Sequence, residues 1–216
     1  MTILALEFSS SQRSVALARG GEVLAEAAET GERGTNAFGM IEKVLAAANM
    51  GREEIECLAV GLGPGSYTGI RVALSIAQGW QLACGVKLLG IGSVECLVAQ
   101  AQAEKISGRV NVVIDAQRGE FYLATYDVSA DGAKEVAPLK IVAATEVESR
   151  ASAGESLIGP EVTRWFATGN VLFPRAAMLA ALAASRTNFM AGEKLEPVYL
   201  RETNFVKAPP RRMMVA

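Results

Sequence analysis

The sequence of 216 residues contains no histidine, and this absence excludes several classes of protein. A Ser-His-Asp triad, a Cys-His nucleophile pair and any zinc site with imidazole ligands all need the missing side chain. Cysteine is scarce as well, since Cys57, Cys84 and Cys96 are never two residues apart and form no CxxC motif. An odd number of cysteines fits a reducing compartment better than a disulfide framework. We therefore expect no catalytic residue and no metal site in this chain.

Neither sign of charge is in excess, and long apolar runs are missing. The 21 Lys and Arg residues oppose 23 Asp and Glu residues, for a formal net charge of -2. A protein that binds nucleic acid by itself is normally basic, so any contact with RNA or DNA is expected to be shared with a partner. No apolar run reaches the roughly 18 residues of a membrane helix, and no charged leader precedes the first run. We expect a cytoplasmic protein without membrane contact.

One order of elements occurs twice along the chain. An apolar run at 3–6 ends at Glu7, and a second apolar run at 112–114 ends at Asp115. Each is followed by a polar turn that contains an arginine, and then by a returning apolar strand. This repeat predicts an α/β protein built from two similar subdomains that face each other.

We place the boundary between the two subdomains at the glycine that follows a predicted helix. The first subdomain then spans residues 1–107, and the second spans 108–216 with a flexible tail from Lys207 onward, where prolines and charges follow one another. Apolar periodicity and turn residues predict strands at 3–6, 14–19, 22–26, 57–60, 87–91, 112–114, 120–127 and 156–158, and helices at 36–50, 70–83, 94–102, 144–151, 161–168 and 175–185.

A glycine-rich segment at 61–71 lies between a predicted strand and a predicted helix. Glycines there permit close backbone approach, and the start of a helix attracts anions, so a phosphate-binding loop is one interpretation. The Walker A motif needs Lys-Ser/Thr where this chain has Ile70-Arg71, and the dinucleotide fingerprint needs a glycine where Ser66 stands. The other interpretation is a tight turn in which Ser66 or Thr68 caps the helix.

The helix predicted at 70–83 is apolar on nearly every side, so it must be covered on more than one. Gly69, Ala73 and Ala77 form a small-residue strip on which a second helix could lie. The covering element is either the helix at 36–50 of the same chain or a partner subunit. The partner interface predicted on these two helices comprises Phe38, Ile41, Leu45, Gly69, Ile70, Ala73, Leu74 and Ala77.

Glu7 and Asp115 end matching strands. Such a carboxylate pair across a cleft would suit Mg²⁺ binding or general base catalysis. A carboxylate at the end of a strand is equally typical of a solvated turn. The sequence leaves both interpretations open.

Four segments in this order resemble the bacterial TsaB (YeaZ) family: residues 3–9, 63–71, 115–122 and 197–201. The motif positions that carry the resemblance are Gly63, Pro64, Gly65, Ser66, Tyr67, Thr68, Gly69, Arg71, Asp115, Arg118, Gly119 and Glu120. The resemblance implies a duplicated ASKHA fold, related to actin and hexokinase, with two α/β subdomains. This agrees with the repeat.

The resemblance also implies a function. TsaB-type proteins are non-catalytic scaffold subunits that bind and activate a TsaD homologue, which threonylcarbamoylates N6 of adenosine 37 in tRNA. The implied partners are TsaD, the ATPase TsaE and a second copy of the chain, with tRNA bound through the complex. TsaD holds a metal with histidines, which this chain lacks, so no cofactor is expected in the subunit alone, although ATP could bind in the assembled complex.

Three positions depart from the family pattern. Glu7-Phe8-Ser9 replaces Asp-Thr-Ser, Asn36-Ala37 replaces His-Ser, and the turn at 158–160 lacks the glycines of an adenosine site. The alternative function is an autonomous ATP-dependent small-molecule kinase on the same fold. It requires a catalytic aspartate and complete phosphate loops, of which this chain has fragments.

Overall fold

The computed structural model describes residues 1–31 and 36–200. Its strands are β1 (Thr2–Glu7), β2 (Gln12–Arg19), β3 (Glu22–Thr30), β4 (Cys57–Gly61), β5 (Lys87–Ile91), β6 (Gly108–Asp115), β7 (Glu120–Ser129), β8 (Gly132–Ala143), β9 (Ser156–Gly159) and β10 (Asn170–Val171). Its helices are α1 (Ala37–Ala47), α2 (Tyr67–Cys84), α3 (Ser93–Ala103), α4 (Ala144–Ser152) and α5 (Ala176–Ala184), with 3₁₀ turns η1 (Arg52–Glu54), η2 (Val162–Arg164) and η3 (Gly192–Lys194).

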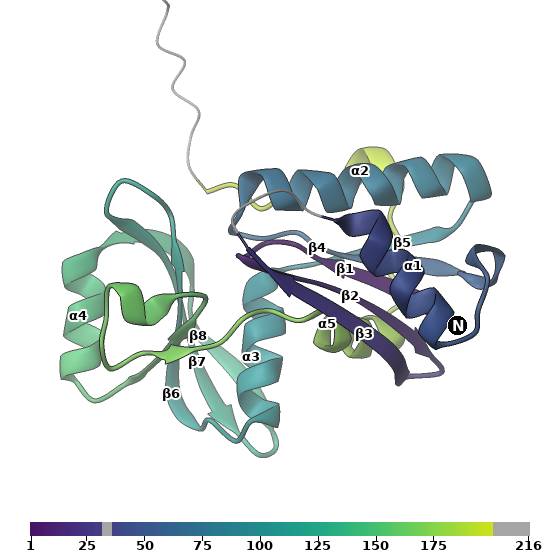
Figure 1. Ribbon diagram of the computed structural model, residues 1–216. Helices are drawn as coiled ribbons and strands as arrows, with labels where there is room; N and C mark the ends of the chain where they lie inside the picture. The colour runs from purple at the N-terminus through teal and green to yellow at the C-terminus, as the bar shows by residue number, and fades with distance from the viewer. Residues whose placement is uncertain (32–35, 201–216) are drawn as a thin grey trace, which may run out of the picture.

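The described strands form two five-stranded sheets with the same topology (Figure 1). The first has the order β3-β2-β1-β4-β5, and the second has the order β8-β7-β6-β9-β10. In each sheet, the first three strands along the chain form an antiparallel meander, β1-β2-β3 or β6-β7-β8. The fourth strand, β4 or β9, pairs parallel to the central strand, and the fifth, β5 or β10, pairs parallel to the fourth. The predicted duplicated α/β architecture is confirmed.

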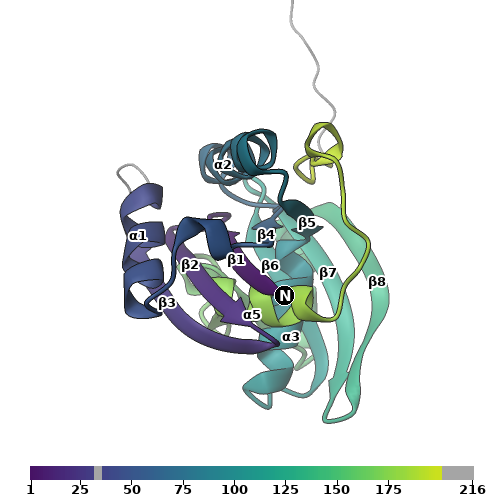
Figure 2. The ribbon, with the colours of Figure 1, turned by 90° about the vertical axis from the view of Figure 1, so that its right-hand side faces the viewer.

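The central strand β1 is buried on both faces, and its alternating side chains separate two cores. Leu4 and Leu6 pack with α1 and α2 on one face. Ile3 and Ala5 pack with α5 on the other. Figure 2 shows α1 and α2 together on one side of the first sheet and α5 on the opposite side. This sheet and these three helices are called the first lobe.

The second lobe consists of the second sheet with α3 and α4. Val94, Leu97 and Ala101 of α3 pack on β6 and β7, whereas α5 returns from the second half of the chain to the first sheet. The predicted division into 1–107 and 108–216 therefore needs correction. The apolar face of α3 fits the second sheet, and that of α5 fits the first, so the chain crosses between the lobes twice.

The structure differs from the predicted secondary structure mainly at one predicted helix and at strand β8. The helix predicted at 161–168 is only the short turn η2, because Glu161 has a left-handed φ of 57°, and Trp165 and Phe166 both pack edge-on against Phe121. Strand β8 was not predicted, since most of its side chains are exposed and lack the apolar alternation of a half-buried strand.

The tail predicted to be flexible lies outside the described residues. No helix within the described ranges is long and apolar enough to cross a membrane.

Candidate functional site

The glycine-rich loop between β4 and α2 packs against the turn that follows β1. The backbone N–H of Ser66 donates to Ser9 O at 2.7 Å, and Ser66 Oγ accepts from the N–H of Gly69 at 3.3 Å. A Cβ on Gly65 would lie 2.0 Å from Ser9 O, and Gly65 has a φ of 148°. The loop thus needs glycine for close backbone packing, and Ser66 caps α2, as in the tight-turn interpretation.

Glu7 is fully buried beneath this loop. Its Oε1 accepts from the N–H of Ser9 at 2.8 Å, and its Oε2 lies 3.3 Å from Ser93 Oγ. Ser93 Oγ also lies 2.8 Å from Ser9 Oγ, so one of these two hydroxyl groups donates to the other. Gly61 is required here because its Cβ would lie 2.0 Å from Oε2. Both oxygens of this carboxyl group are therefore engaged inside the protein rather than facing an open cleft.

Burial raises the pKa of Glu7 above its ordinary value, although the hydrogen bonds from Ser9 and Ser93 oppose the shift. Protonated Glu7 therefore contributes stability that is fully present below about pH 4.5 and is lost as the pH rises through the raised pKa. We expect Glu7→Gln, which keeps the shape, to become progressively more stable than the parent protein as the pH rises through this window. Urea unfolding of both proteins between about pH 4.5 and 8 measures the difference, and parallel pH profiles would contradict it.

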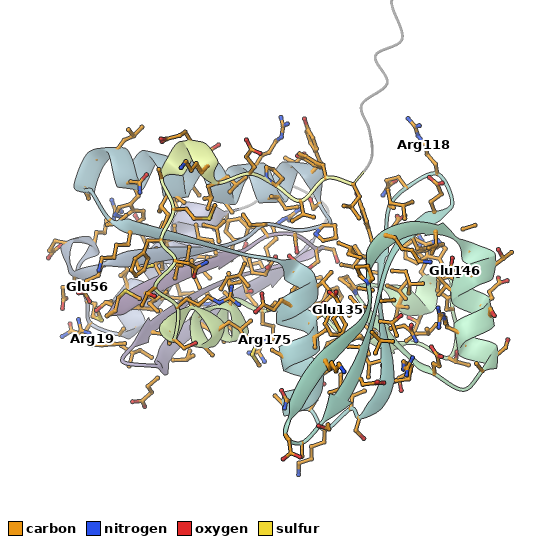
Figure 3. The ribbon with its side chains drawn as sticks, turned by 180° about the vertical axis from the view of Figure 1, so that it is seen from behind. Arg19, Glu56, Arg118, Glu135, Glu146 and Arg175 are labelled. Carbon is orange, nitrogen blue, oxygen red and sulfur yellow. The ribbon has the colours of Figure 1, made fainter. Side chains whose placement is uncertain are left out.

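The family segment at 115–122 forms the β6–β7 turn. Asp115 Oδ1 accepts from the backbone N–H of Gln117 at 2.7 Å, and Oδ2 accepts from Gln117 Nε2 at 2.9 Å. Gln117, Arg118 and Gly119 all have positive φ, and the N–H of Glu120 closes the turn onto Gln117 O. Arg118 points away from both lobes (Figure 3). Asp115 thus shapes a turn, as in the second of the two interpretations of this carboxylate.

An apolar groove on the surface of the first lobe lies between α1 and α2. It encloses about 810 Å³. Two aromatic side chains that line the groove are largely exposed to solvent. The exposed fraction is 65% for Phe38 and 55% for Tyr67. The lining residues that α2 contributes include Tyr67, Arg71, Val72, Ser75, Ile76, Gly79, Trp80 and Ala83. An exposed apolar surface of this kind is typical of a protein-binding site.

Most of the predicted interface residues lie elsewhere, and this prediction needs correction. Of the eight, Phe38 alone is exposed, while Ile41 reaches the groove but is only 1% exposed. The remaining six are buried in the core of the first lobe: Leu45, Gly69, Ile70, Ala73, Leu74 and Ala77. The strip of small residues faces the sheet, where a Cβ on Gly69 would lie 2.0 Å from Phe8 O.

The outer face of α2 carries a second small-residue strip of the same spacing. Ser75, Gly79 and Ala83 line the groove, and apart from its chain neighbours and the backbone of α2 no atom lies within 4 Å of the place where a Cβ of Gly79 would stand. The sequence holds a signal for this face, because Arg71 and Ser75 are polar and Gly79 continues their four-residue spacing.

A C-terminal segment at 186–200 packs against another side of α2. Its residues 197–200 belong to a family segment, but the sequence did not predict this contact. Gln78 Nε2 donates to Gly192 O at 2.9 Å, and the N–H of Gly192 donates to Gln81 Oε1 at 2.7 Å. The segment ends beside the groove, where Tyr199 Oη accepts from Arg71 Nε at 3.3 Å. The Arg71 guanidinium in turn lies 4.0 Å from the centre of the Tyr67 ring. The segment thus contacts α2 near both ends, through Arg71 in the N-terminal part and through Gln78 and Gln81 in the C-terminal part.

The cysteines and acidic residues offer no metal site in the described part of the chain, where no three of them come together. Cys57 and Cys96 are buried, and burial raises the pKa of the Cys57 thiol to about 12 and that of Cys96 still further above its ordinary value. Cys84 is exposed at the end of α2.

Known proteins resemble this chain over nearly its whole length. The family model "TsaD: tRNA N6-adenosine threonylcarbamoyltransferase" matches residues 6–201. The tRNA threonylcarbamoyladenosine biosynthesis protein TsaB of Escherichia coli is 29% identical over 93% of this chain and 95% of its own. The solved structure of YeaZ from Pseudomonas aeruginosa superposes with a TM-score of 0.77 at 25% identity, covering 92% of this chain and 99% of that one. A second Pseudomonas aeruginosa structure, described as similar to peptidase YEAZ, has a TM-score of 0.79 at 26% identity over 93% and 99%. With its duplicated fold and matching motifs, this chain belongs to the TsaD family and, within it, to the TsaB (YeaZ) group.

Proposed function

We propose that this protein is a non-catalytic subunit of a tRNA-modifying complex, in which it binds and activates a TsaD-type threonylcarbamoyltransferase. The observation that carries the proposal is the apolar groove between α1 and α2, with Phe38 and Tyr67 exposed beside it. The relatives named for threonylcarbamoyladenosine biosynthesis supply the reaction. A surface of this chemistry is more useful to a subunit that docks on another protein than to one that works alone.

The positions of the two carboxylates support a non-catalytic role. Glu7 has no exposed surface, and Asp115 closes a turn, so neither is placed as the catalytic carboxylate that the kinase alternative requires. We propose that any ATP binds in the assembled complex. We propose that tRNA binding also belongs to the complex, because a chain with a net charge of -2 lacks the excess of basic residues that binds phosphates. A TsaE-type ATPase and a second copy of this chain are the further partners proposed.

Reconstitution of tRNA modification tests the proposal. We expect a TsaD homologue from the same source, supplied with the threonylcarbamoyl donor and unmodified tRNA, to form threonylcarbamoyladenosine only when this protein is added. The isolated protein is expected to form none. Full modification without it, or modification by this protein alone, would overturn the proposed role.

A further inference from the structure

We propose that the buried carboxyl group of Glu7 forms a pH-sensitive latch at the joint between the two lobes, closed when the group is protonated and released when it is ionised. The latch is the contact of Glu7 with Ser9 and Ser93. The joint consists of the two places where the chain crosses between the lobes, at 91–93 and at 172–176. Neither the latch nor the joint lines the groove, so the proposal does not depend on the proposed function.

Glu7 lies where both crossings meet the first lobe. The first crossing ends at Ser93, which begins α3, and Ser93 Oγ lies 3.3 Å from Glu7 Oε2. The second crossing ends at Ala176, which begins α5 and whose N–H donates to Ser14 Oγ at 2.8 Å. Ser14 of β2 is the cross-strand partner of Glu7, so the two side chains share one face of the sheet. Both crossings are therefore anchored at the same end of the first sheet.

The glycine-rich loop completes the enclosure of the latch. The N–H of Ser93 donates to Gly63 O at 2.8 Å, and the N–H of Ser66 donates to Ser9 O at 2.7 Å. Glu7, Ser9 and Ser93 are all buried. These bonds connect the end of β1, the loop before α2 and the start of α3, so a change at Glu7 acts on segments of both lobes.

No cation compensates a charge on Glu7. Within the described ranges, its carboxyl group forms no ion pair with a lysine or an arginine. Arg13 of β2 belongs to the opposite face of the sheet, since side chains alternate along a strand. Arg175, at the second crossing, pairs with Glu26 of β3. An ionised Glu7 would therefore be a buried charge held by hydrogen bonds alone.

The other elements around the latch add no free positive charge either. On α3, Glu95 is acidic and pairs with Arg186. Burial raises the pKa of Cys96 far above its ordinary value, so this thiol stays neutral. The glycine-rich loop at 61–66 has no ionisable side chain. These surroundings favour the neutral carboxyl group, and burial accordingly raises the pKa of Glu7.

The protonated and the ionised carboxyl group differ in what they offer to the second lobe. When protonated, Glu7 donates from Oε2 to Ser93 Oγ, and the Ser93 hydroxyl is free to donate to Ser9 Oγ. When the proton leaves for solvent, Glu7 only accepts, and a full charge remains in a buried site. Opening of the joint lets water reach this charge. Ionisation therefore favours the open arrangement.

Proton linkage gives the direction and the size of the effect. In the open arrangement Glu7 is solvated and titrates near its ordinary pKa of 4.5, whereas burial raises its pKa in the closed arrangement. The contribution of the latch is fully present below about pH 4.5 and is lost as the pH rises through the raised pKa. Because the closed form holds one more proton in this window, the opening constant should rise by up to about tenfold per pH unit.

Amide hydrogen exchange of the isolated protein, corrected for the intrinsic pH dependence of exchange, measures this opening constant at the N–H groups of Ser66 and Ser93. We expect it to rise by up to about tenfold per pH unit and to depend little on low concentrations of urea. The amides of β4 are expected to open only by global unfolding, with a strong dependence on urea. Glu7→Gln keeps a donor and cannot ionise, so its opening constant should not change with pH. Asp115→Asn, the matched change in the second lobe, should behave like the parent.

Spin labels report whether the lobes move when the latch opens. Glu22→Cys in β3 and Ser149→Cys in α4 place one label on each lobe at an exposed position. Cys84→Ser removes the exposed native cysteine, and the other two cysteines are buried. We expect the distribution of distances between the labels to broaden as the pH rises from about 5 to about 8 and to stay narrow throughout in Glu7→Gln.

Several results would overturn the proposal. An opening constant that does not change with pH, or that changes equally in Glu7→Gln, would show that Glu7 is not the titrating group of a latch. Exchange at Ser66 and Ser93 with the same urea dependence as in β4 would show that only global unfolding exposes them. A pH-dependent opening with an unchanged distance distribution would confine the effect to the loop and exclude a latch between the lobes.

Discussion

Replacing Ala73 by glutamate is expected to unfold the protein or bring it close to unfolding. Ala73 is fully buried between α2 and the first sheet, among apolar side chains such as Leu4 and Val60. A carboxylate there has no hydrogen-bonding partner of opposite charge, and a small site must also accept a longer side chain. The expected loss is about 3 to 5 kcal/mol or more, against a total stability of about 5 to 15 kcal/mol for a typical domain.

Ser75→Glu is the matched control on the same helix. Ser75 lies two residues further along, on the exposed groove face of α2. The charge change is identical, so we expect its free energy of unfolding to stay within about 0.5 kcal/mol of the parent protein. Urea unfolding followed by circular dichroism measures both variants. Equal losses in the two, or a stable Ala73→Glu protein, would mean that α2 presents the opposite face to the sheet.

Gly79→Arg is expected to abolish binding of the TsaD homologue without unfolding the protein. The space around the missing Cβ of Gly79 is open, and Gly79 does not have positive φ. Arginine also favours a helix over glycine by about 0.5 to 1 kcal/mol, so the variant should be at least as stable as the parent. Its long charged side chain would occupy the groove in which the homologue docks. We expect the affinity to fall by about a hundredfold or more.

Leu82→Arg controls for the added charge. Leu82 is on the same helix and 89% exposed, but it does not line the groove. The same cation at this position should change the affinity by no more than about twofold. Calorimetric titration of the homologue with each variant, after confirming its fold, makes the comparison. A comparable loss in Leu82→Arg would assign the effect to charge rather than to the groove.

The duplication of the fold was predictable because each half marks its central strand in the same way. Glu7 and Asp115 each close a buried apolar strand, and the Gly20-Gly21 pair marks the first hairpin, where both residues have positive φ. Local patterns of this kind predict the strands correctly because the apolar side chains of these central strands are buried in the folded protein. Strand β8 lies at the edge of its sheet, where backbone pairing rather than side-chain burial determines the structure.

The inward face of α2 could not be predicted by the same reasoning. The strip of Gly69, Ala73 and Ala77 and the strip of Ser75, Gly79 and Ala83 share one spacing, so periodicity alone does not choose between them. The close approach of Gly69 to Phe8 O chooses the first strip as the inner face. The segment at 186–200 is held by pairs such as Gln78 with Gly192, which are 114 residues apart in the chain and leave no local pattern.

Amide hydrogen exchange of this protein with and without the TsaD homologue tests the central claim most directly, because it locates the contact without any substitution. The account predicts that added protection is concentrated in α1 and α2, on the residues that border the groove, and is small in β7, β8 and α4 of the second lobe. Binding that protects the second lobe and leaves α1 and α2 unchanged would contradict the assignment of the groove as the docking site.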